Sequence, residues 1–443
     1  MSGRAGAVVA FLALAATLVA AIALTTPWQP LAEAPGSGRG VATAAAEVPV
    51  DPHRDFRAAE IAREDAFHAA VRPPVYATIV VGLLVALLFG LTPLGARLVS
   101  ALAEPLGGGP GRQWVLRVAA GALVLPLIGR LVTLPFSVRA EVALRRFGLS
   151  TQTWGSWTLD QVKGYALSGA LLLLALLALY ALAARFPRGW WLPAAAGAGA
   201  LVLVVSFAFP LVVEPVFNRF TSLPPSPLRA SLLELAERDG VPVDDVLVAD
   251  ASRRTTALNA YVSGFGSTRR IVVYDTLLER GTPEEVRAVV AHELGHAARN
   301  DVLHGTLAGA LGAAAAVCLL YLALTSPVLL RRAGLPAAAA DPRSVALLLA
   351  VVAVLSALGG PVQMLVSRRI EARADVHALA LTREPGPFVA MQRRLAVENL
   401  SDLDPSRPVY LLFSSHPSAP QRIALARAWA RRAGVPEPVP LIR

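Results

Sequence analysis

The sequence predicts a predominantly α-helical protein that crosses a membrane several times. Of its 443 residues, 55% are hydrophobic and only 16% are charged, and the mean hydropathy is +0.55. Soluble globular proteins carry charge on about a quarter of their residues. Seven apolar stretches are each roughly 20 residues long, which is enough to cross a hydrocarbon core of about 30 Å. We therefore expect a polytopic membrane protein with seven transmembrane helices.

The predicted spans lie near residues 6–26, 75–98, 114–134, 165–184, 191–213, 305–330 and 343–366. The first stretch has two interpretations, because Arg4 before it and the small residues after it are also typical of a cleaved signal peptide. An uncleaved helix is the interpretation favoured here. Trp114, Trp190 and Trp191 stand at the starts of two later spans, as in an interfacial aromatic belt.

Three polar blocks accompany the spans, at residues 27–74, 214–304 and 367–443. The central block predicts a helix at 228–238, a strand at 246–249, and a hairpin whose strands, 260–262 and 270–274, flank the turn at 264–267. The predicted organisation has four parts. Spans one to five with the loop 27–74 occupy 1–213, a catalytic domain occupies 214–304, spans six and seven occupy 305–366, and the tail 367–443 completes the catalytic domain.

The most specific motif is His292-Glu293-Leu294-Gly295-His296. On an α-helix, residues four apart lie on one face, so both imidazoles can reach a single metal ion. Glu293 is offset around the helix and is placed to act as a general base toward a water molecule beside the metal. The Thr-Pro-Glu-Glu sequence at 282–285 predicts the helix start, with an N-cap hydroxyl and a capping-box glutamate. The pattern is that of a zinc peptidase.

A catalytic zinc ion takes three protein ligands, so one ligand is missing from the histidine pair. The single cysteine, Cys318, lies in an apolar run and cannot build a thiolate site. Glu371 follows the last span and is the predicted third ligand. Asp375, one helical turn later, is predicted to accept the outer ring N–H of a ligating histidine. From spacing alone, a solvated juxtamembrane helix with surface ion pairs is an equal alternative for this segment.

Several segments together resemble the membrane-embedded type I CAAX prenyl protease family. They are 145–153, 214–221, 259–261, 270–278, 292–296, 371–375 and 415–417, and the similarity runs from about residue 55 to the C-terminus. The resemblance implies seven tilted helices around a large water-filled chamber and a gluzincin-like α+β catalytic domain on the cytosolic side. It also implies one zinc ion per chain, bound by His292, His296 and Glu371.

The same resemblance implies further roles in the site. Asn259 and Tyr261 would lie on an edge strand that pairs with an extended substrate. His416 would line the site and stabilise the developing oxyanion, although a histidine in a Pro-rich surface turn is the alternative. Arg422 would contribute to the substrate-binding region by pairing with a carboxylate near the metal.

The predicted function is that of an integral-membrane zinc metalloendopeptidase acting on membrane-associated or hydrophobic peptides and proteins. Its predicted partners are such a substrate and the lipid bilayer. The net charge of +10 is scattered among the apolar runs, so we expect no nucleic acid partner. Arginines at 139, 145 and 146 and at 368, 369 and 373 favour a cytoplasmic catalytic side in a bacterial inner membrane.

Three alternatives stay open at this level. The first is a membrane-protein quality-control protease of the heat-shock type, although that type has four spans. The second, an intramembrane zinc protease, would carry its ligands within apolar helices. The third is a receptor or scaffold that keeps zinc without catalysis, and the intact Glu293 weighs against it.

Overall fold

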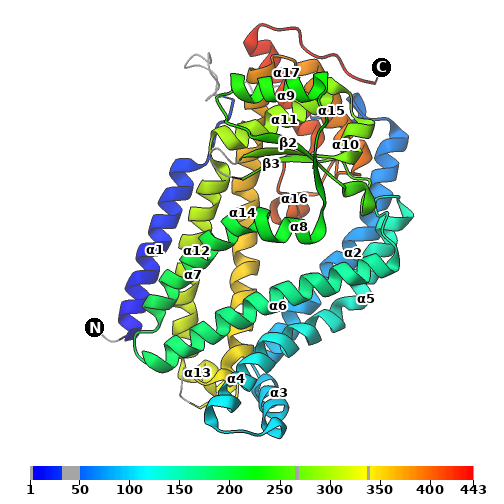
Figure 1. Cartoon of the computed structure of the whole chain (residues 1–443). Coiled ribbons are helices and arrows are strands. Elements are labelled where there is room, and N and C mark those ends of the chain that lie inside the picture. The colour runs from blue at the N-terminus through cyan, green and yellow to red at the C-terminus, as the bar shows by residue number, and fades with distance from the viewer. Residues whose placement is uncertain (1–2, 32–49, 265–268, 337–339, 443) are drawn as a thin grey trace.

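Seven long apolar helices form most of the molecule (Figure 1). The computed structural model describes residues 3–31, 50–264, 269–336 and 340–442. Within these residues the membrane-spanning segments are Gly3–Thr25, Ala58–Gly90, Pro110–Arg146, Trp154–Arg185, Trp191–Phe217, Asp301–Leu324 and Pro342–Thr382. Each contains one of the seven predicted spans or most of it, and the predicted polytopic α-helical fold is confirmed. The water-filled chamber stays a prediction.

The spans are built from several helices whose bounds differ from the predicted ones. They comprise α1 (Gly3–Thr25), α2 (Ala58–Gly90), α4 (Pro110–Ala119), α5 (Leu125–Arg146), α6 (Trp154–Arg185), α7 (Trp191–Ala208), α8 (Glu214–Phe217), α12 (Asp301–Leu324) and α14 (Val345–Thr382). Short π-helical turns, Ala120–Val124 and Phe209–Val213, join α4 to α5 and α7 to α8. Such turns are not visible in hydrophobic periodicity.

The second span was predicted at 75–98, but its helix ends at Gly90. A separate helix, α3 (Pro93–Ala103), follows. Thr92 ends the continuity because its hydroxyl caps the N–H of Leu94 and Pro93 takes the first position of the new helix. At the other end, α2 extends back through Pro73 and Pro74 to Ala58, so the polar start of this helix lies outside the predicted span.

The last span continues without a break into the predicted third-ligand segment. Helix α14 has 38 residues, so it is about 57 Å long at a rise of 1.5 Å per residue. Its apolar first part crosses the membrane region, and its last part carries the buried side chains of Arg368, Glu371 and Asp375. The alternative of a solvated helix is therefore wrong for this segment, because Arg368, Glu371 and Asp375 are buried in the protein interior.

A small sheet lies at one end of the long helices (Figure 1). Its strands are β1 (Phe220–Ser222), β2 (Asp245–Ala249), β3 (Ala260–Ser263) and β4 (Arg270–Tyr274), in the order β1-β2-β4-β3. Strands β2 and β4 are parallel, and the other two pairs are antiparallel. The predicted antiparallel pairing of β3 with β4 is confirmed, whereas most of the predicted turn, 265–267, lies outside the described residues. Strand β3 is at the sheet edge.

Helices from the central block and from the tail complete this end of the molecule. They are α9 (Pro227–Arg238), α10 (Asp275–Arg280), α11 (Pro283–Ala298), α15 (Pro385–Glu398), α16 (Arg407–Phe413) and α17 (Ala419–Ala433). One buried core joins the sheet to both groups of helices, through residues such as Ile271, Val290, Leu294, Val389 and Ile423. The tail is therefore an integral part of the domain that holds the His-Glu-x-x-His helix.

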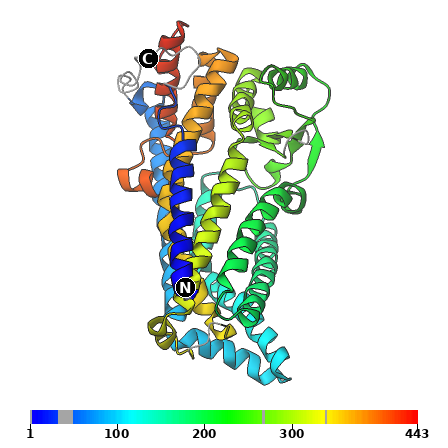
Figure 2. The same cartoon turned by 90° about the vertical axis from the view of Figure 1, so that its left-hand side faces the viewer.

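The end of the molecule opposite the sheet consists of short helices that connect the long ones. At the end opposite the sheet, α3 and the short helix α13 (Pro327–Arg332) connect the long helices (Figure 1). Helix α1 starts at that end, whereas the C-terminus lies at the sheet end. Turned by 90°, the molecule shows α1 beside α12, which packs against both α1 and α7 (Figure 2). The N-terminal span thus packs against α12 on the outer side of the bundle and stays largely exposed, and that it is an uncleaved helix stays a prediction.

Candidate metal centre and active site

Helix α11 begins as the sequence predicts. The Thr282 hydroxyl accepts the N–H of Glu285 at 3.3 Å, and the Glu285 carboxylate accepts the N–H of Thr282 at 2.8 Å. This reciprocal capping satisfies two N–H groups that the first helical turn cannot pair. The helix then runs through the core against α14 and α15, and most of its residues between 285 and 295 are buried. Its packing fixes the direction in which His292 and His296 point.

The side chains of His292, His296 and Glu371 meet between α11 and α14. The Nε2 atoms of the two histidines are 3.2 Å apart, and Glu371 oxygens lie 3.1 Å from His292 Nε2 and 3.6 Å from His296 Nε2. One ligand atom from each residue can be chosen so that all lie within 4.8 Å of one another. Ligand atoms bonded to one tetrahedral zinc ion at about 2.0–2.2 Å are roughly 3.4 Å apart. The donor set therefore fits a single metal ion.

The outer nitrogen of each histidine faces a carboxylate. Asp375 Oδ1 lies 2.9 Å from Nδ1 of His292, and Asp301 Oδ2 lies 2.9 Å from Nδ1 of His296. A carboxylate that accepts a hydrogen bond from Nδ1–H keeps the proton on Nδ1, so the lone pair of Nε2 is free and points toward the cluster. Both histidines are thus held in the tautomer that a metal requires. Asp375 was placed here by the sequence analysis, whereas Asp301 was missed.

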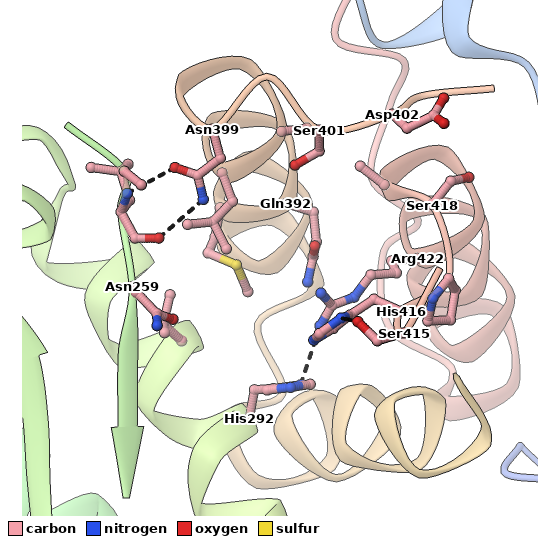
Figure 3. A pocket seen from close by; sticks show the side chains of 18 of the residues that line it. Asn259, His292, Gln392, Asn399, Ser401, Asp402, Ser415, His416, Ser418 and Arg422 are labelled. Atoms are coloured by element: carbon pink, nitrogen blue, oxygen red, sulfur yellow. Dashed lines mark hydrogen bonds between the residues drawn. The ribbon is translucent and has the colours of Figure 1, made fainter. Parts of the chain in front are cut away.

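Arg422 anchors the Asp375 carboxylate from helix α17. Its Nε donates to Oδ2 at 2.8 Å and its Nη2 to Oδ1 at 2.5 Å. Nη2 also lies 3.3 Å from His292 Nδ1, a contact drawn as a dashed line in Figure 3. Asp375 is completely buried. The two-point contact offsets the cost of burying that charge and fixes its orientation. Arg422 therefore lies beside a carboxylate near the cluster, as the family resemblance implied.

Glu293 lies on the open side of the cluster. It lines a cavity of about 620 Å³ together with His292, His416 and Arg422. Within the described part of the chain its carboxylate makes no hydrogen bond or ion pair, so its oxygens are available to a substrate or water. Burial raises the pKa of Glu293 above the usual range of a glutamate, and the neighbouring histidines oppose that rise. A raised pKa suits a base that must later give the proton back.

His416 reaches the same cluster from the segment before α17. Its Nε2 lies 3.2 Å from Glu371 Oε2, and its Nδ1 lies 2.8 Å from the Ser415 hydroxyl. Figure 3 shows the labelled side chains of His416, Arg422 and His292 close together at one side of the cavity. The side chain of His416 is about half exposed, at 52%, which keeps it accessible from the cavity.

The two predicted substrate-binding residues of the edge strand lie differently. Asn259 directly precedes β3 and lines the cavity, and its carbonyl accepts the N–H of Tyr274 at 3.0 Å. Tyr261 lies within β3, and its hydroxyl donates to Glu214 at 3.3 Å. The phenol of Tyr261 thus contacts the end of the fifth span, and Asn259 is the one of the two that borders the cavity.

The bundle of apolar helices and the metal-ligand cluster at its end define a membrane-embedded metallopeptidase. Comparison with known proteins agrees with this class. Residues 223–430 match the family model of peptidase family M48, and residues 74–219 match that of the CAAX prenyl protease N-terminal region with five membrane helices. A Bacillus subtilis protein described as the uncharacterized metalloprotease YhfN is 34% identical over 310 residues, which are 70% of this chain and 72% of that protein. The chain belongs to peptidase family M48 and is a metalloprotease.

Other relatives match over shorter stretches. CAAX prenyl protease 1 of Saccharomyces cerevisiae is 32% identical over 187 residues, which cover 41% of this chain and 40% of the yeast protein. The crystal structure of S. mikatae Ste24p has a TM-score of 0.72 with 21% identity, and the match covers 95% of this chain and 98% of that one. The fold is therefore that of Ste24p over nearly the whole chain.

Proposed function

We propose that this protein is an integral-membrane zinc endopeptidase in which His292, His296 and Glu371 hold the metal ion and Glu293 is the general base. The observation that carries the proposal is the convergence of three ligand atoms beside a carboxylate that is free to accept a proton. The paired Nδ1 atoms support zinc, which prefers neutral imidazole and carboxylate ligands. A purely structural site would have no use for the unpaired Glu293.

The chemistry is peptide hydrolysis by water. When bound, the ion acts as a Lewis acid toward the scissile carbonyl and lowers the pKa of water. Glu293 takes the proton of the attacking water on its carboxylate and transfers it to the leaving amine nitrogen. His416 donates a hydrogen bond from Nε2 to the carbonyl oxygen as negative charge develops there. Asp375 and Asp301 keep the two ligating imidazoles in place throughout.

Strand β3 is the proposed template for the substrate backbone. The Tyr274 N–H bonds to the Asn259 carbonyl, so residues 259 and 274 form a hydrogen-bonded antiparallel pair. Along an antiparallel ladder, hydrogen-bonded pairs alternate with pairs that are not hydrogen-bonded. Ala260 and Val262 belong to the second kind, so their N–H and C=O groups point away from β4, toward the free edge of the sheet. An extended peptide can add to this edge through those groups.

The proposed substrates are hydrophobic or membrane-associated peptides and proteins, because the site lies at the end of the membrane-spanning bundle. We place the catalytic end on the cytoplasmic side of a bacterial inner membrane. The support is the group of arginines in the last turns of α5, at 139, 145 and 146, together with those in the last part of α14. Both helix ends lie toward the sheet end of the molecule (Figure 1).

Metal analysis of detergent-purified protein, combined with cleavage of a fluorogenic hydrophobic peptide, tests the proposal. We expect about one zinc ion per chain, loss of cleavage with 1,10-phenanthroline and recovery on adding Zn²⁺. Cleavage that is indifferent to the chelator, or zinc-loaded protein that cleaves none of a broad peptide set, would contradict it.

A further inference from the structure

The free edge of β3 ends at the N-terminal side of the strand, because the backbone groups just before it are already hydrogen-bonded. The alternation that leaves Ala260 and Val262 open also turns the N–H and C=O of Leu258 away from β4. These two groups would offer a pairing peptide the next position along the same edge. In the structure they already have a partner, and that partner is a side chain.

Asn399 occupies the position. Its Oδ1 accepts the N–H of Leu258 at 2.8 Å, and its Nδ2 donates to the Leu258 carbonyl at 3.0 Å. A side-chain amide presents one acceptor and one donor side by side, as a peptide group of a neighbouring strand does. Figure 3 shows Asn399 with both dashed bonds, across the cavity from His292. Asn399 and Leu258 both line that cavity.

The backbone around Asn399 is held firmly. Asn399 is the residue that ends α15, and the N–H of Ser401 bonds back to the carbonyl of Ala396 at 2.9 Å. This closure requires a left-handed residue between them, which is usually glycine. Here it is the buried Leu400, with φ of 50°. A non-glycine residue in this conformation is strained and persists where the surroundings over-determine it. The amide of Asn399 is therefore presented from a rigid turn.

We propose that Asn399 is a positioning residue that ends the substrate-pairing edge. A peptide pairs with Val262 and Ala260 and must leave the strand before Leu258, where the cavity continues past Asn399. This inference rests on the proposed function of β3 as a substrate template. Because side chains and hydrogen bonds repeat every two residues along a strand, the place where pairing stops sets which peptide bond faces Glu293.

The test is a product analysis of the Asn399→Ala variant. The strand keeps its path without the Asn399 amide, because Thr276 Oγ1 holds the Ala257 carbonyl at 2.7 Å and Tyr274 holds that of Asn259. With the Leu258 position open, a peptide can slide by one repeat. On a peptide of uniform side chains around the scissile bond, mass spectrometry should show a new cleavage displaced by two residues. Zinc content should stay unchanged.

A matched control lies one residue away. Glu398 is at the end of the same helix, forms a partly exposed ion pair with Arg280 at 2.8 Å and lines a different cavity. Glu398→Gln should give the wild-type products. Should Asn399→Ala fail to fold, Asn399→Ser has a side chain too short to bond both groups of Leu258, and it should also yield displaced product.

The inference is overturned if a folded, zinc-loaded Asn399 variant gives only the wild-type products, whatever its rate. The failure of the proposed function is a separate result. If the wild-type protein cleaves no peptide, or if blocking the N–H of Val262 leaves cleavage unchanged, the template itself is contradicted and this inference with it.

Discussion

Two carboxylates fix the tautomer and the orientation of the two histidines in the site. Asp375 and Asp301 each accept a hydrogen bond from an Nδ1 atom, which directs both Nε2 atoms at the space shared with Glu371. Without these partners each imidazole would exchange tautomers and rotate. The residues that would hold the metal and the residues that orient them therefore form one unit, and they should respond to substitution with graded losses.

Glu371→Ala should lower zinc occupancy and activity together, because it removes one of three proposed ligands. Asp375→Ala should weaken zinc binding less, by about 10- to 100-fold, as expected of a residue that orients a ligand. Zinc titration of the purified variants measures both effects. Stoichiometric zinc and full activity in Glu371→Ala would mean that the third ligand lies elsewhere.

Asp301→Asn should also weaken zinc binding by about 10- to 100-fold, because the amide can present its own N–H to Nδ1 and favour the wrong tautomer. Arg373 pairs with Asp301, so this carboxylate is also held from α14. Asp275→Asn, which removes a carboxylate that accepts hydrogen bonds from the N–H and hydroxyl of Ser252, serves as the control. Equal zinc affinities in the two variants would exclude the orienting role.

The proposed ligands could be predicted from the sequence, but not all the residues that orient them. Glu371 and Asp375 were predictable because a four-residue spacing on a helix places both on one face. Asp301 was not, because it reaches His296 through a chain reversal at Asn300, which adopts φ of 52°. Asn399 lies 141 residues from its partner Leu258, and no local pattern predicts such a contact. The proposed roles of all these residues stay predictions.

At the scale of elements, the sequence predicted the seven long apolar helices, α9, α11 and most of the sheet, but not the shorter connecting helices, the tail helices α15–α17 or the places where helices join. Strands β2, β3 and β4 were predicted from short apolar runs, whereas β1 was missed, and the N-terminus of α11 was predicted from its capping box. The continuity of α14 was missed, because hydrophobicity stops where the membrane stops whereas the helix does not. The break after Gly90 was missed because a Thr-Pro pair ends a helix without changing its apolar character.

The register of β3 sharpens a proline test. Val262→Pro deletes an N–H that faces the free edge, so it should impair peptide cleavage while zinc stays bound. Tyr261→Pro deletes an N–H that pairs with Val272, so it should mainly lower the melting temperature. Asn259→Ala, like Val262→Pro, should impair peptide cleavage while zinc stays bound. If folded, zinc-loaded Val262→Pro cleaved a model peptide at the wild-type rate, recognition would have to come from other surfaces.

At the scale of the molecule, a buried ion pair joins segments from the two ends of the chain. Arg427 on α17 donates to both oxygens of Asp55 at 2.6 and 2.8 Å, and both side chains are at most 3% exposed. Asp55 precedes α2 and lies 372 residues away from Arg427. The sequence gives no sign of this contact, which ties the segment before the second span to the catalytic end.

Asp55→Ala should destabilise the protein by about 3–5 kcal/mol, because it leaves a buried guanidinium without its charge partner. Zinc affinity of the folded protein should not change. Arg431, also on α17, forms an exposed pair with Glu437 beyond the end of the helix, and Arg431→Ala should cost less than about 1 kcal/mol. Thermal unfolding in detergent compares the two, and similar melting temperatures would show that the buried pair contributes little.

The central claim is that zinc and Glu293 together perform peptide hydrolysis at the end of a membrane-spanning bundle. The most direct measurement is zinc content and peptide cleavage in Glu293→Gln beside the wild-type protein. We predict equal zinc content, an equal melting temperature and no measurable cleavage, because the amide cannot accept a proton from water while the proposed ligands are untouched. Near-normal turnover in the zinc-loaded variant would contradict the assignment of the base, and loss of zinc would make Glu293 part of the metal site instead.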